Sequence, residues 1–179
     1  MRPTSDRVRE AIFARLGDLG GLRVLDLFAG TGAMGIEAVS RGAERLVSVD
    51  RSRQSVGVIE RNLDRLGVSS QARVMRADAQ AAIRSLDRSG ETFDLVILDP
   101  PYGDLDEPPA VLSALVACDI LDPGAVVVVE GPKRHSLVEV PGLMLEKERC
   151  YGDTAVYWLG VDRAVRDPDG AEGRERNDG

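Results

Sequence analysis

The feature that most constrains the fold is an apolar segment that runs directly into a glycine-rich turn. Residues 22–28 are typical of a buried strand, and Gly30, Gly32 and Gly35 follow it in G-x-G-x-x-G spacing. Glycines at such a turn let the backbone bend sharply and approach a ligand without a Cβ atom in the way. The segment therefore predicts a strand, a ligand-binding loop and a helix that opens at the loop.

The rest of the chain repeats this alternation of strand and helix. Apolar stripes at helical spacing predict a first helix from about Ser5, capped by Thr4, and a later one between Ser52 and Gly67. Further strands are expected at 45–49, 72–75, 93–98 and 126–129, and further helices after the glycine loop, at 79–86 and at 110–117. Two extended runs, 143–150 and 154–159, form a predicted antiparallel hairpin. The pattern predicts an α/β fold with a mostly parallel seven-stranded sheet that ends in this hairpin.

Length and composition indicate one domain. The chain has 179 residues, which suits a single core over residues 1–160, and residues 161–179 are polar enough to predict a disordered tail. No apolar run approaches the roughly 20 residues of a membrane span, and the start resembles no secretory signal. We therefore expect a cytoplasmic protein with no membrane partner. The 2 cysteines and 1 histidine are too few for a zinc site, so we expect no metal.

Net charge limits the partners. The formal charge is −7 and the pI about 4.8, which argues against broad binding to duplex DNA, since that binding needs a basic face. Arg2, Arg7, Arg9 and Arg15 nevertheless gather near the N-terminus. They are candidates for a local nucleic-acid contact, although a solvated helix face explains them equally well. Because no long apolar stripe is left over, we expect a monomer.

The glycine loop alone does not decide between two cofactors. Asp50 closes the second strand at about the distance expected of a ribose-binding acid, so the loop fits a nicotinamide or flavin enzyme as well as a methyltransferase. Asp26, inside the first strand, favours the methyltransferase because a buried carboxylate needs a partner such as an amino group. Asp78 follows the third strand, where it can accept from an adenine amine or cap the next helix. The chain also lacks a second domain to hold a dehydrogenase substrate.

The sharpest signal is Asp99-Pro100-Pro101-Tyr102, directly after the fourth strand. Two prolines fix the backbone and remove two donors, so the Asp99 carboxylate and the Pro100 carbonyl present acceptors in fixed positions. An aromatic amine needs such acceptors, because its lone pair is delocalised until the nitrogen becomes pyramidal. Tyr102 offers a flat face for a base taken out of its stack. The motif therefore favours methyl transfer to an exocyclic amine by direct displacement, although a rigid turn with a surface tyrosine is the simpler alternative.

Several blocks together resemble one known family. They are the start 2–10 with Arg-Pro-Thr-Ser-Asp, the loop 25–32, Ser-Arg-Gly-Ala at 40–43, Asp-Pro-Pro-Tyr at 99–102 and Tyr-Gly-Asp-Thr at 151–154. In this combination the chain, over about residues 2–159, resembles the bacterial 16S ribosomal RNA guanine(966)-N2 methyltransferases, the RsmD family. The loop and Asp-Pro-Pro-Tyr are shared with many amino-methyltransferases, whereas the Arg-Pro-Thr block is much more specific. Family members usually carry a basic segment before that block, and RNA binding is expected to depend on it.

The resemblance implies a Rossmann-like class I fold and S-adenosylmethionine as cofactor. It implies that Asp26, Gly30 and Gly32 hold the methionine side of the cofactor, Asp50 the ribose and Asp78 the adenine. The expected cofactor contacts also include Phe28, Ala29, Thr31, Arg51, Ala79 and Asp99. The expected catalytic residues are Asp99, Pro100, Pro101 and Tyr102, and the expected nucleic-acid contacts are Arg2, Thr4, Arg7 and Arg9. The implied partner is 16S rRNA in an assembling small ribosomal subunit.

Three other functions stay open on the sequence. Asp-Pro-Pro-Tyr serves the N6 amine of adenine as well as the N2 amine of guanine, so a DNA or RNA adenine methyltransferase is one alternative. An inactive Rossmann-like subunit that binds RNA or a protein partner is another, against which the intact motifs argue. A dinucleotide oxidoreductase is the third and fits least well, because nothing in the chain would hold its substrate.

Overall fold

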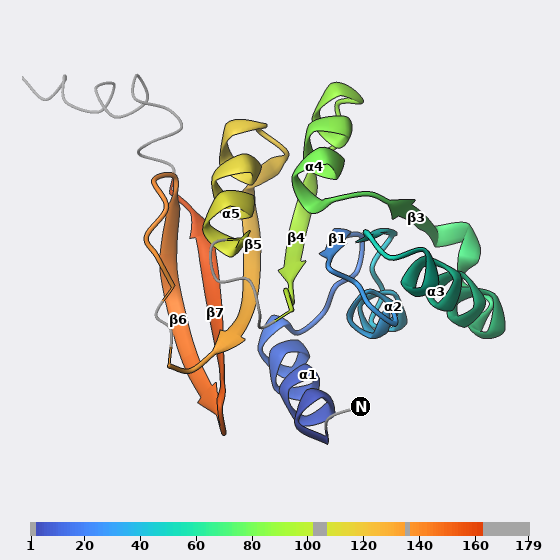
Figure 1. Cartoon of the computed structure of the whole chain (residues 1–179), viewed down its shortest axis with the longest axis horizontal. Helices are drawn as coiled ribbons and strands as arrows, with labels where there is room; N and C mark the ends of the chain where they lie inside the picture. The colour runs from blue at the N-terminus through green and yellow to red at the C-terminus, as the bar shows by residue number, and fades with distance from the viewer. Residues whose placement is uncertain (1–2, 102–106, 135–136, 163–179) are drawn as a thin grey trace, which may run out of the picture.

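The computed structural model describes residues 3–101, 107–134 and 137–162, except for the side chains of residues 3–5. Its strands are β1 (Arg23–Leu27), β2 (Arg45–Asp50), β3 (Ala72–Arg76), β4 (Phe93–Leu98), β5 (Leu121–Pro132), β6 (Leu143–Tyr151) and β7 (Thr154–Val161). They form one seven-stranded sheet in the order β3-β2-β1-β4-β5-β7-β6. The strands from β1 to β5 are parallel, and β7 runs antiparallel to both β5 and β6. Figure 1 shows the β6–β7 hairpin at one side of the sheet. The predicted fold class is confirmed.

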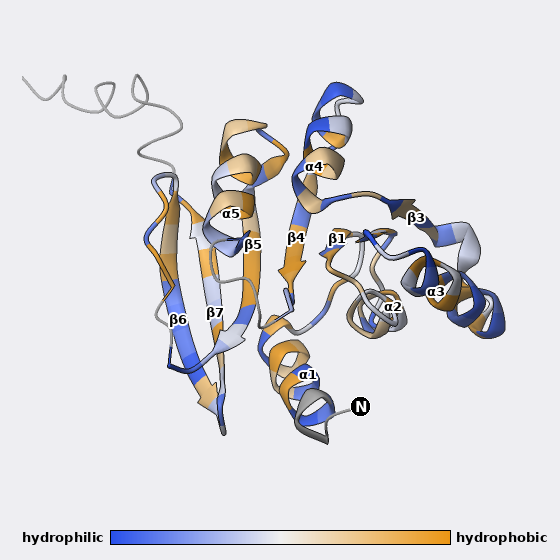
Figure 2. Cartoon of the chain, in the orientation of Figure 1, coloured by the Kyte–Doolittle hydropathy of each residue, from blue (hydrophilic) through white to orange (hydrophobic). Residues whose placement is uncertain are grey.

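Helices cover both faces of this sheet. They are α1 (Pro3–Leu16), α2 (Ala33–Ser40), α3 (Arg53–Leu66), α4 (Ala79–Arg88) and α5 (Glu107–Ala117), with a short 3-10 turn at Ser69–Gln71. Apolar residues of α1, α2 and α3 share one core with alternate strand residues, of which Trp158 is the largest. Those of α4 and α5 share a second core with the intervening strand residues. In Figure 2 the buried strand β4 is largely orange, whereas the middle of β6 is blue.

Local signals fix most element ends as predicted. The Ser52 side chain accepts from the Ser55 amide at the start of α3, and Gly67 ends that helix in the left-handed region, which costs a glycine little. Asp78 caps α4 by accepting from the amides of Gln80 and Ala81. The hairpin between β6 and β7 turns at Gly152, which has a φ of 61°.

Three predicted boundaries were wrong. The first helix starts at Pro3 rather than near Ser5, so Thr4 lies inside it and is not its N-cap; a proline suits the first turn because its missing N–H is not needed there. The same reason explains why α5 starts at Glu107, ahead of two prolines. Strand β5 extends from Leu121 to Pro132, well beyond the predicted 126–129. The predicted tail lies almost wholly outside the described residues. No helix among the residues described is long and apolar enough to cross a membrane.

Candidate active site

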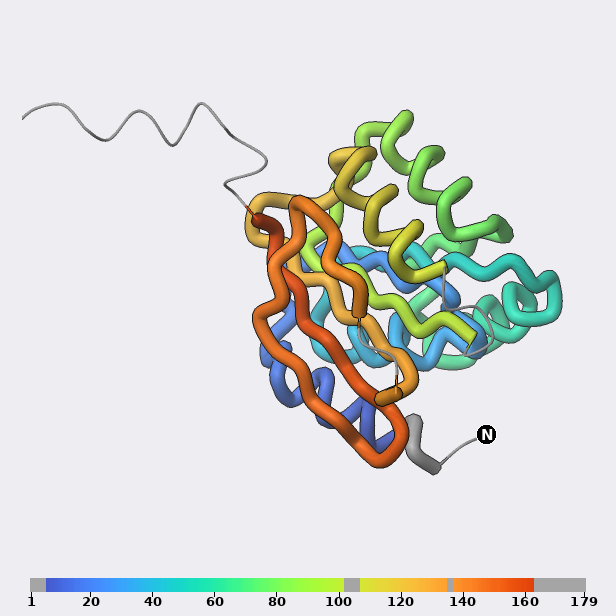
Figure 3. The backbone as a smooth tube through the Cα atoms, turned by 60° about the vertical axis from the view of Figure 1, so that its left-hand side comes forward, coloured from blue at the N-terminus to red at the C-terminus, as the bar shows by residue number. Residues whose placement is uncertain are grey.

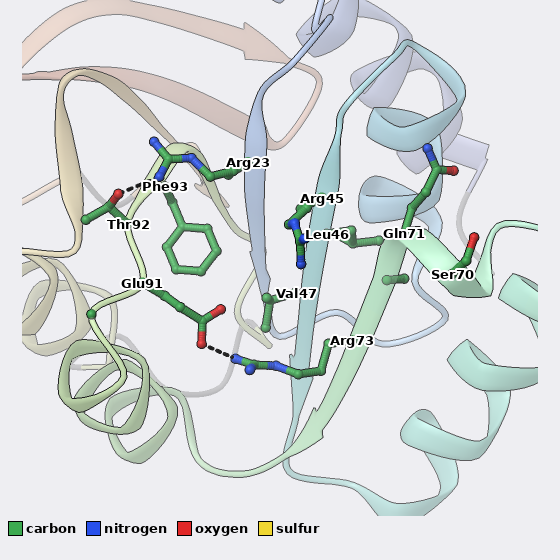
Figure 4. A pocket seen from close by; sticks show the side chains of 12 residues that line it. Arg23, Arg45, Leu46, Val47, Ser70, Gln71, Arg73, Glu91, Thr92 and Phe93 are labelled. Carbon is green, nitrogen blue, oxygen red and sulfur yellow. Dashed lines mark hydrogen bonds and ion pairs between the residues drawn. The ribbon is translucent and has the colours of Figure 1, made fainter.

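Among the described residues, a pocket lies at each end of the parallel strands. One of about 360 Å³ lies where β1 to β4 begin, and Figure 4 shows its rim. There Arg23 is ion-paired with Asp94 and Asp122, and Arg73 with Glu91, so two of its cations are already engaged. The other, of about 370 Å³, lies where the same strands end. Open α/β sheets bind ligands outside the carboxyl ends of their strands, and the second pocket contains the sequence motifs. It is therefore the candidate active site.

Asp26 lies beneath this pocket, in the middle of the sheet. Its side chain is 1% exposed, and its Oδ2 accepts a hydrogen bond from the Gly35 amide at 3.0 Å. The pKa of Asp26 is raised to about 7: burial is the largest cause and the charges of Asp99 and Asp50 add to it, whereas the Gly35 hydrogen bond opposes them. The carboxylate is thus costly to ionise in the free protein, and a cation above it would relieve that cost.

The glycine loop connects Asp26 to the pocket. Phe28, Gly30 and Gly32 all adopt positive φ angles, of 63°, 56° and 79°, a region that favours glycine and is strained for phenylalanine. A Cβ on Gly32 would come within 3.2 Å of the Ile59 side chain on α3, which would have to shift by a few tenths of an ångström to admit it. The α3 side chain of Asn62 donates to the Thr31 carbonyl at 2.9 Å. Contacts with α3 therefore fix the position of the loop beside the pocket.

Asp50 and Asp78 line the next two walls. At the end of β2, Asp50 accepts from the Gly30 amide through Oδ2 at 2.9 Å and from the Ser52 amide through Oδ1 at 2.8 Å. Asp78, after β3, uses Oδ1 for both of its capping bonds to α4, so the helix does not engage its Oδ2. The capping interpretation of Asp78 is confirmed, and it leaves an acceptor at the pocket.

Asp99, Pro100 and Pro101 form the wall after β4. Asp99 stays open to solvent in the pocket, yet the surrounding protein atoms displace part of its hydration, and this desolvation raises the pKa of Asp99 to about 6. Pro100 is buried and Pro101 exposed. Neither proline has an N–H, so this wall presents carboxylate and carbonyl oxygens without competing backbone donors.

Most of the predicted site residues meet in this pocket. Those that line it are Phe28, Gly30, Asp50, Arg51, Asp78, Ala79, Asp99, Pro100 and Pro101. Asp26, Ala29, Thr31 and Gly32 lie beneath it or in the same loop without lining it. Tyr102 lies outside the described residues. The sequence interpretation missed Val49, Ser52, Ala77 and Glu107, which complete the lining; of these, only Glu107, an acidic residue soon after Asp-Pro-Pro-Tyr, carried a signal.

The acids give the pocket its electrostatic character. Asp50, Asp78, Asp99 and Glu107 line it and Asp26 lies below, whereas Arg51 is the one cation among the described lining residues. Such a set favours a ligand with positive charge. Within the described residues, no three His, Cys, Asp or Glu side chains are grouped as metal ligands.

Three of the four predicted nucleic-acid contacts, Thr4, Arg7 and Arg9, belong to α1. Arg7 is exposed, and Arg9 pairs with Asp6 at 3.0 Å one turn away. Arg2 lies outside the described residues, as does the side chain of Thr4. The structure thus places the two described arginines on the first half of α1, where they stay candidates.

The sheet order, the final antiparallel hairpin and the glycine loop at the strand ends define a Rossmann-like class I methyltransferase fold. Residues 1–160 match the family described as Conserved hypothetical protein 95. "Putative rRNA methyltransferase YlbH" of Bacillus subtilis is 36% identical over 157 residues, which are 87% of this chain and 85% of the relative. "Ribosomal RNA small subunit methyltransferase D" of Escherichia coli is 33% identical over 159 residues, 87% of this chain and 77% of the relative.

A solved structure agrees with these relatives. A conserved hypothetical protein from Streptococcus pyogenes superposes with a TM-score of 0.79 at 36% identity, over 86% of this chain and 95% of the other. The chain therefore belongs to the RsmD family of ribosomal RNA methyltransferases.

Proposed function

We propose that this chain transfers a methyl group from S-adenosylmethionine to the exocyclic N2 amine of a guanine in 16S rRNA of the small ribosomal subunit. The observation that carries the proposal is the meeting of the glycine loop, Asp50, Asp78 and Asp99-Pro100-Pro101 in one pocket of about 370 Å³. That volume lies within the usual range of about 300–1,000 Å³ for small-molecule sites. The names of the relatives support rRNA as the substrate class.

The acidic pocket fits this cofactor. S-adenosylmethionine supplies an activated methyl group on a sulfonium, and both the sulfonium and its amino group are positive. Asp26 would orient the amino group through the glycine loop, and Asp50 would accept from the ribose hydroxyls with the lone pairs that its two amide bonds leave. The unengaged Oδ2 of Asp78 would accept from the adenine amine. Phe28, Arg51 and Ala79 would form the walls around these polar contacts.

Asp99 and Pro100 would act on the target amine. The amine hydrogens donate to the Asp99 carboxylate and to the Pro100 carbonyl, which favours a pyramidal nitrogen with an available lone pair. As the nitrogen attacks, it becomes positive, and the carboxylate stabilises that charge. The raised pKa of Asp99, about 6, also suits it to take the proton that the methylated amine loses. We propose that positioning provides most of the remaining acceleration.

The test is methyl transfer to small ribosomal subunits that lack their native methylation. The purified chain is incubated with S-adenosylmethionine and these subunits, and the RNA is digested to nucleosides for mass spectrometry. N2-methylguanosine is the expected product. N6-methyladenosine would replace the proposed target with the other amine that Asp-Pro-Pro-Tyr can serve. Cofactor binding by calorimetry without any methylated nucleoside would contradict the proposed substrate.

A further inference from the structure

The outer strand of the hairpin separates its charges by face. In antiparallel pairs, residues directly opposite each other stand on the same side of the sheet. Lys147 lies opposite Trp158 and Arg149 opposite Val156, and both of these partners belong to the core under α1. Glu148 lies opposite Tyr157, which belongs to the core on the other face. Burial first, and the charge of Glu148 next, raise the pKa of Tyr157, so Glu148 does stand on that side.

A β-bulge produces this arrangement. The pairing of β6 with β7 shifts register between Leu145 and Lys147. One extra residue in a strand reverses the face of every side chain beyond it. Without the bulge, Lys147 and Arg149 would stand on the α5 side. With it, they stand on the side covered by α1, which itself carries Arg7, Arg9 and Arg15.

These two groups of cations are neighbours. The Arg15 guanidinium lies over the Trp158 ring, 5.3 Å from its centroid, and Lys147 lies opposite Trp158 on the next strand. Figures 1 and 3 both show α1 beside the lower half of the hairpin. We call Arg7, Arg9, Arg15, Lys147 and Arg149 the basic strip. Of these, only Arg9 forms an ion pair with a described residue.

The strip leads to the candidate active site. The distance along β7 from Trp158 to Thr154 is about 13 Å. About nine helical residues span the same distance. Counted back from Arg15, which lies over Trp158, this places the Asp6–Arg7 turn of α1 near the level of Thr154. The last pair between β4 and β5 is Leu98 with Val129. Beyond it, β5 and β7 continue through three further pairs, the last of which is Pro132 with Thr154. The lower end of the strip therefore lies at the same edge as Asp99, which follows Leu98.

The charge of this surface is opposite to that of the whole chain. Alongside its five cations, the acids of α1 and of this face of β5 and β6 are Asp6, Glu10, Glu130 and Glu146, and Asp6 is paired with Arg9. The surface is thus net positive in a chain of formal charge −7. Such a strip beside an otherwise acidic surface fits a polyanion that crosses it in one direction.

We propose that the basic strip binds the phosphate backbone of the RNA that presents its base to Asp99. This inference rests on the proposed function for the identity of the RNA. It extends the contact beyond α1 to the outer strand of the sheet. The strip would hold the strand while the pocket holds the flipped base, so it acts in binding and not in the transfer itself.

The experiment compares two double variants with the same loss of charge. Lys147→Gln with Arg149→Gln removes two cations from the strip. Arg84→Gln with Arg88→Gln is the control, because both side chains are exposed on α4, over the opposite face. Each dye-labelled protein is titrated with protein-free 16S rRNA and with small subunits at several salt concentrations. Circular dichroism confirms folding, and calorimetry measures the Kd for S-adenosylmethionine.

We expect the strip variant to bind both RNA samples about tenfold more weakly at low salt, with a salt slope reduced by about 1.4 to 1.8, since each of the two lost phosphate contacts removes about 0.7 to 0.9. The control pair should bind within twofold of the unsubstituted chain, and the cofactor Kd should be unchanged in both. Equal losses in both pairs, or no loss in either, would overturn the proposal. A loss seen with subunits but not with protein-free RNA would assign the surface to a ribosomal protein instead. If the strip binds RNA but no methylated nucleoside forms, the proposed function fails and this inference stands.

Discussion

Replacing Asp26 with asparagine should stabilise the free protein while weakening its cofactor site. Asparagine keeps the size of the side chain and an oxygen that can accept from the Gly35 amide at 3.0 Å. It removes a charge that the buried position disfavours. The pKa of Asp26 is about 7 in the folded chain, against 3.8 for an ordinary carboxyl. At a pH above 7 the folded state therefore carries the full cost of ionising this group.

The size and the pH window of the effect follow from that difference in pKa. The difference of about three units corresponds to an upper limit of about 4 kcal/mol of unfolding free energy. Between pH 4 and 7 the folded state binds more protons than the unfolded state, so this cost is absent below about pH 4 and grows as the pH rises. We expect Asp26→Asn to gain about 2–4 kcal/mol at pH 8, which is a rise in Tm of about 5–15 °C for a chain of this size. At pH 5 the gain should fall to less than half.

Thermal unfolding of both proteins at pH 8 and pH 5, without cofactor, measures this difference. Asp87→Asn is the control, since Asp87 is exposed on α4, and its Tm should change by at most about 2 °C. Calorimetry with S-adenosylmethionine at pH 8 should show a Kd raised at least about tenfold for Asp26→Asn, as expected when a charged partner is lost. A variant that is no more stable than the unsubstituted chain at pH 8, or equally stabilised at both pH values, would refute the electrostatic account of Asp26.

Three further substitutions test other parts of the site. Asp99→Ala should lower the methyl-transfer rate by at least about a thousandfold with a cofactor Kd within a few-fold, and lost cofactor binding would contradict its assigned role. Asp50→Ala removes the acceptor of the Gly30 and Ser52 amides, so calorimetry should show a Kd for S-adenosylmethionine raised about tenfold; an unchanged Kd would exclude Asp50 from the site. Gly35→Ala would place a Cβ 2.8 Å from Leu46 Cδ1, and urea unfolding should show a loss of about 1–3 kcal/mol. An unaltered midpoint would show that Leu46 can move aside.

The strand–helix order was predictable because buried parallel strands and their helices leave strong local patterns. The helical spacing of Val56, Ile59 and Leu63, between the caps Ser52 and Gly67, predicted both ends of α3 almost to the residue. The length of β5 was not predictable in this way, because Asp122-Pro123-Gly124 resembles a turn in sequence. It is part of a strand only where the register with β4 is irregular, between Phe93 and Leu95, and that irregularity depends on the neighbouring chain.

The candidate site was likewise only partly predictable from the sequence. Glycines and aspartates at strand ends were recognisable, because few other roles explain such residues there. Val49 and Ala77 line the pocket but look like any strand-end apolar residues, so only the folded arrangement reveals them. Only part of the basic strip could be predicted from the sequence. Arginines cluster in the first helix, whereas Lys147 and Arg149 alternate with glutamates. A bulge that no local signal announces decides which face they occupy.

The strand order of the sheet reverses between β1 and β4, and this reversal separates the residues that would bind the cofactor from most of those that would bind the target. Everything that would recognise the cofactor comes from the loops after β1, β2 and β3, on one side of that reversal. What would recognise the target comes from the loop after β4 and the hairpin on the other side, together with α1, which carries three cations of the basic strip. The two sets meet at one wall of the pocket and are otherwise built from different stretches of chain. Such a protein can therefore acquire a new nucleic-acid target through changes in α1, the loop after β4 and the hairpin, while the loops after β1, β2 and β3, and the methyl donor, stay the same.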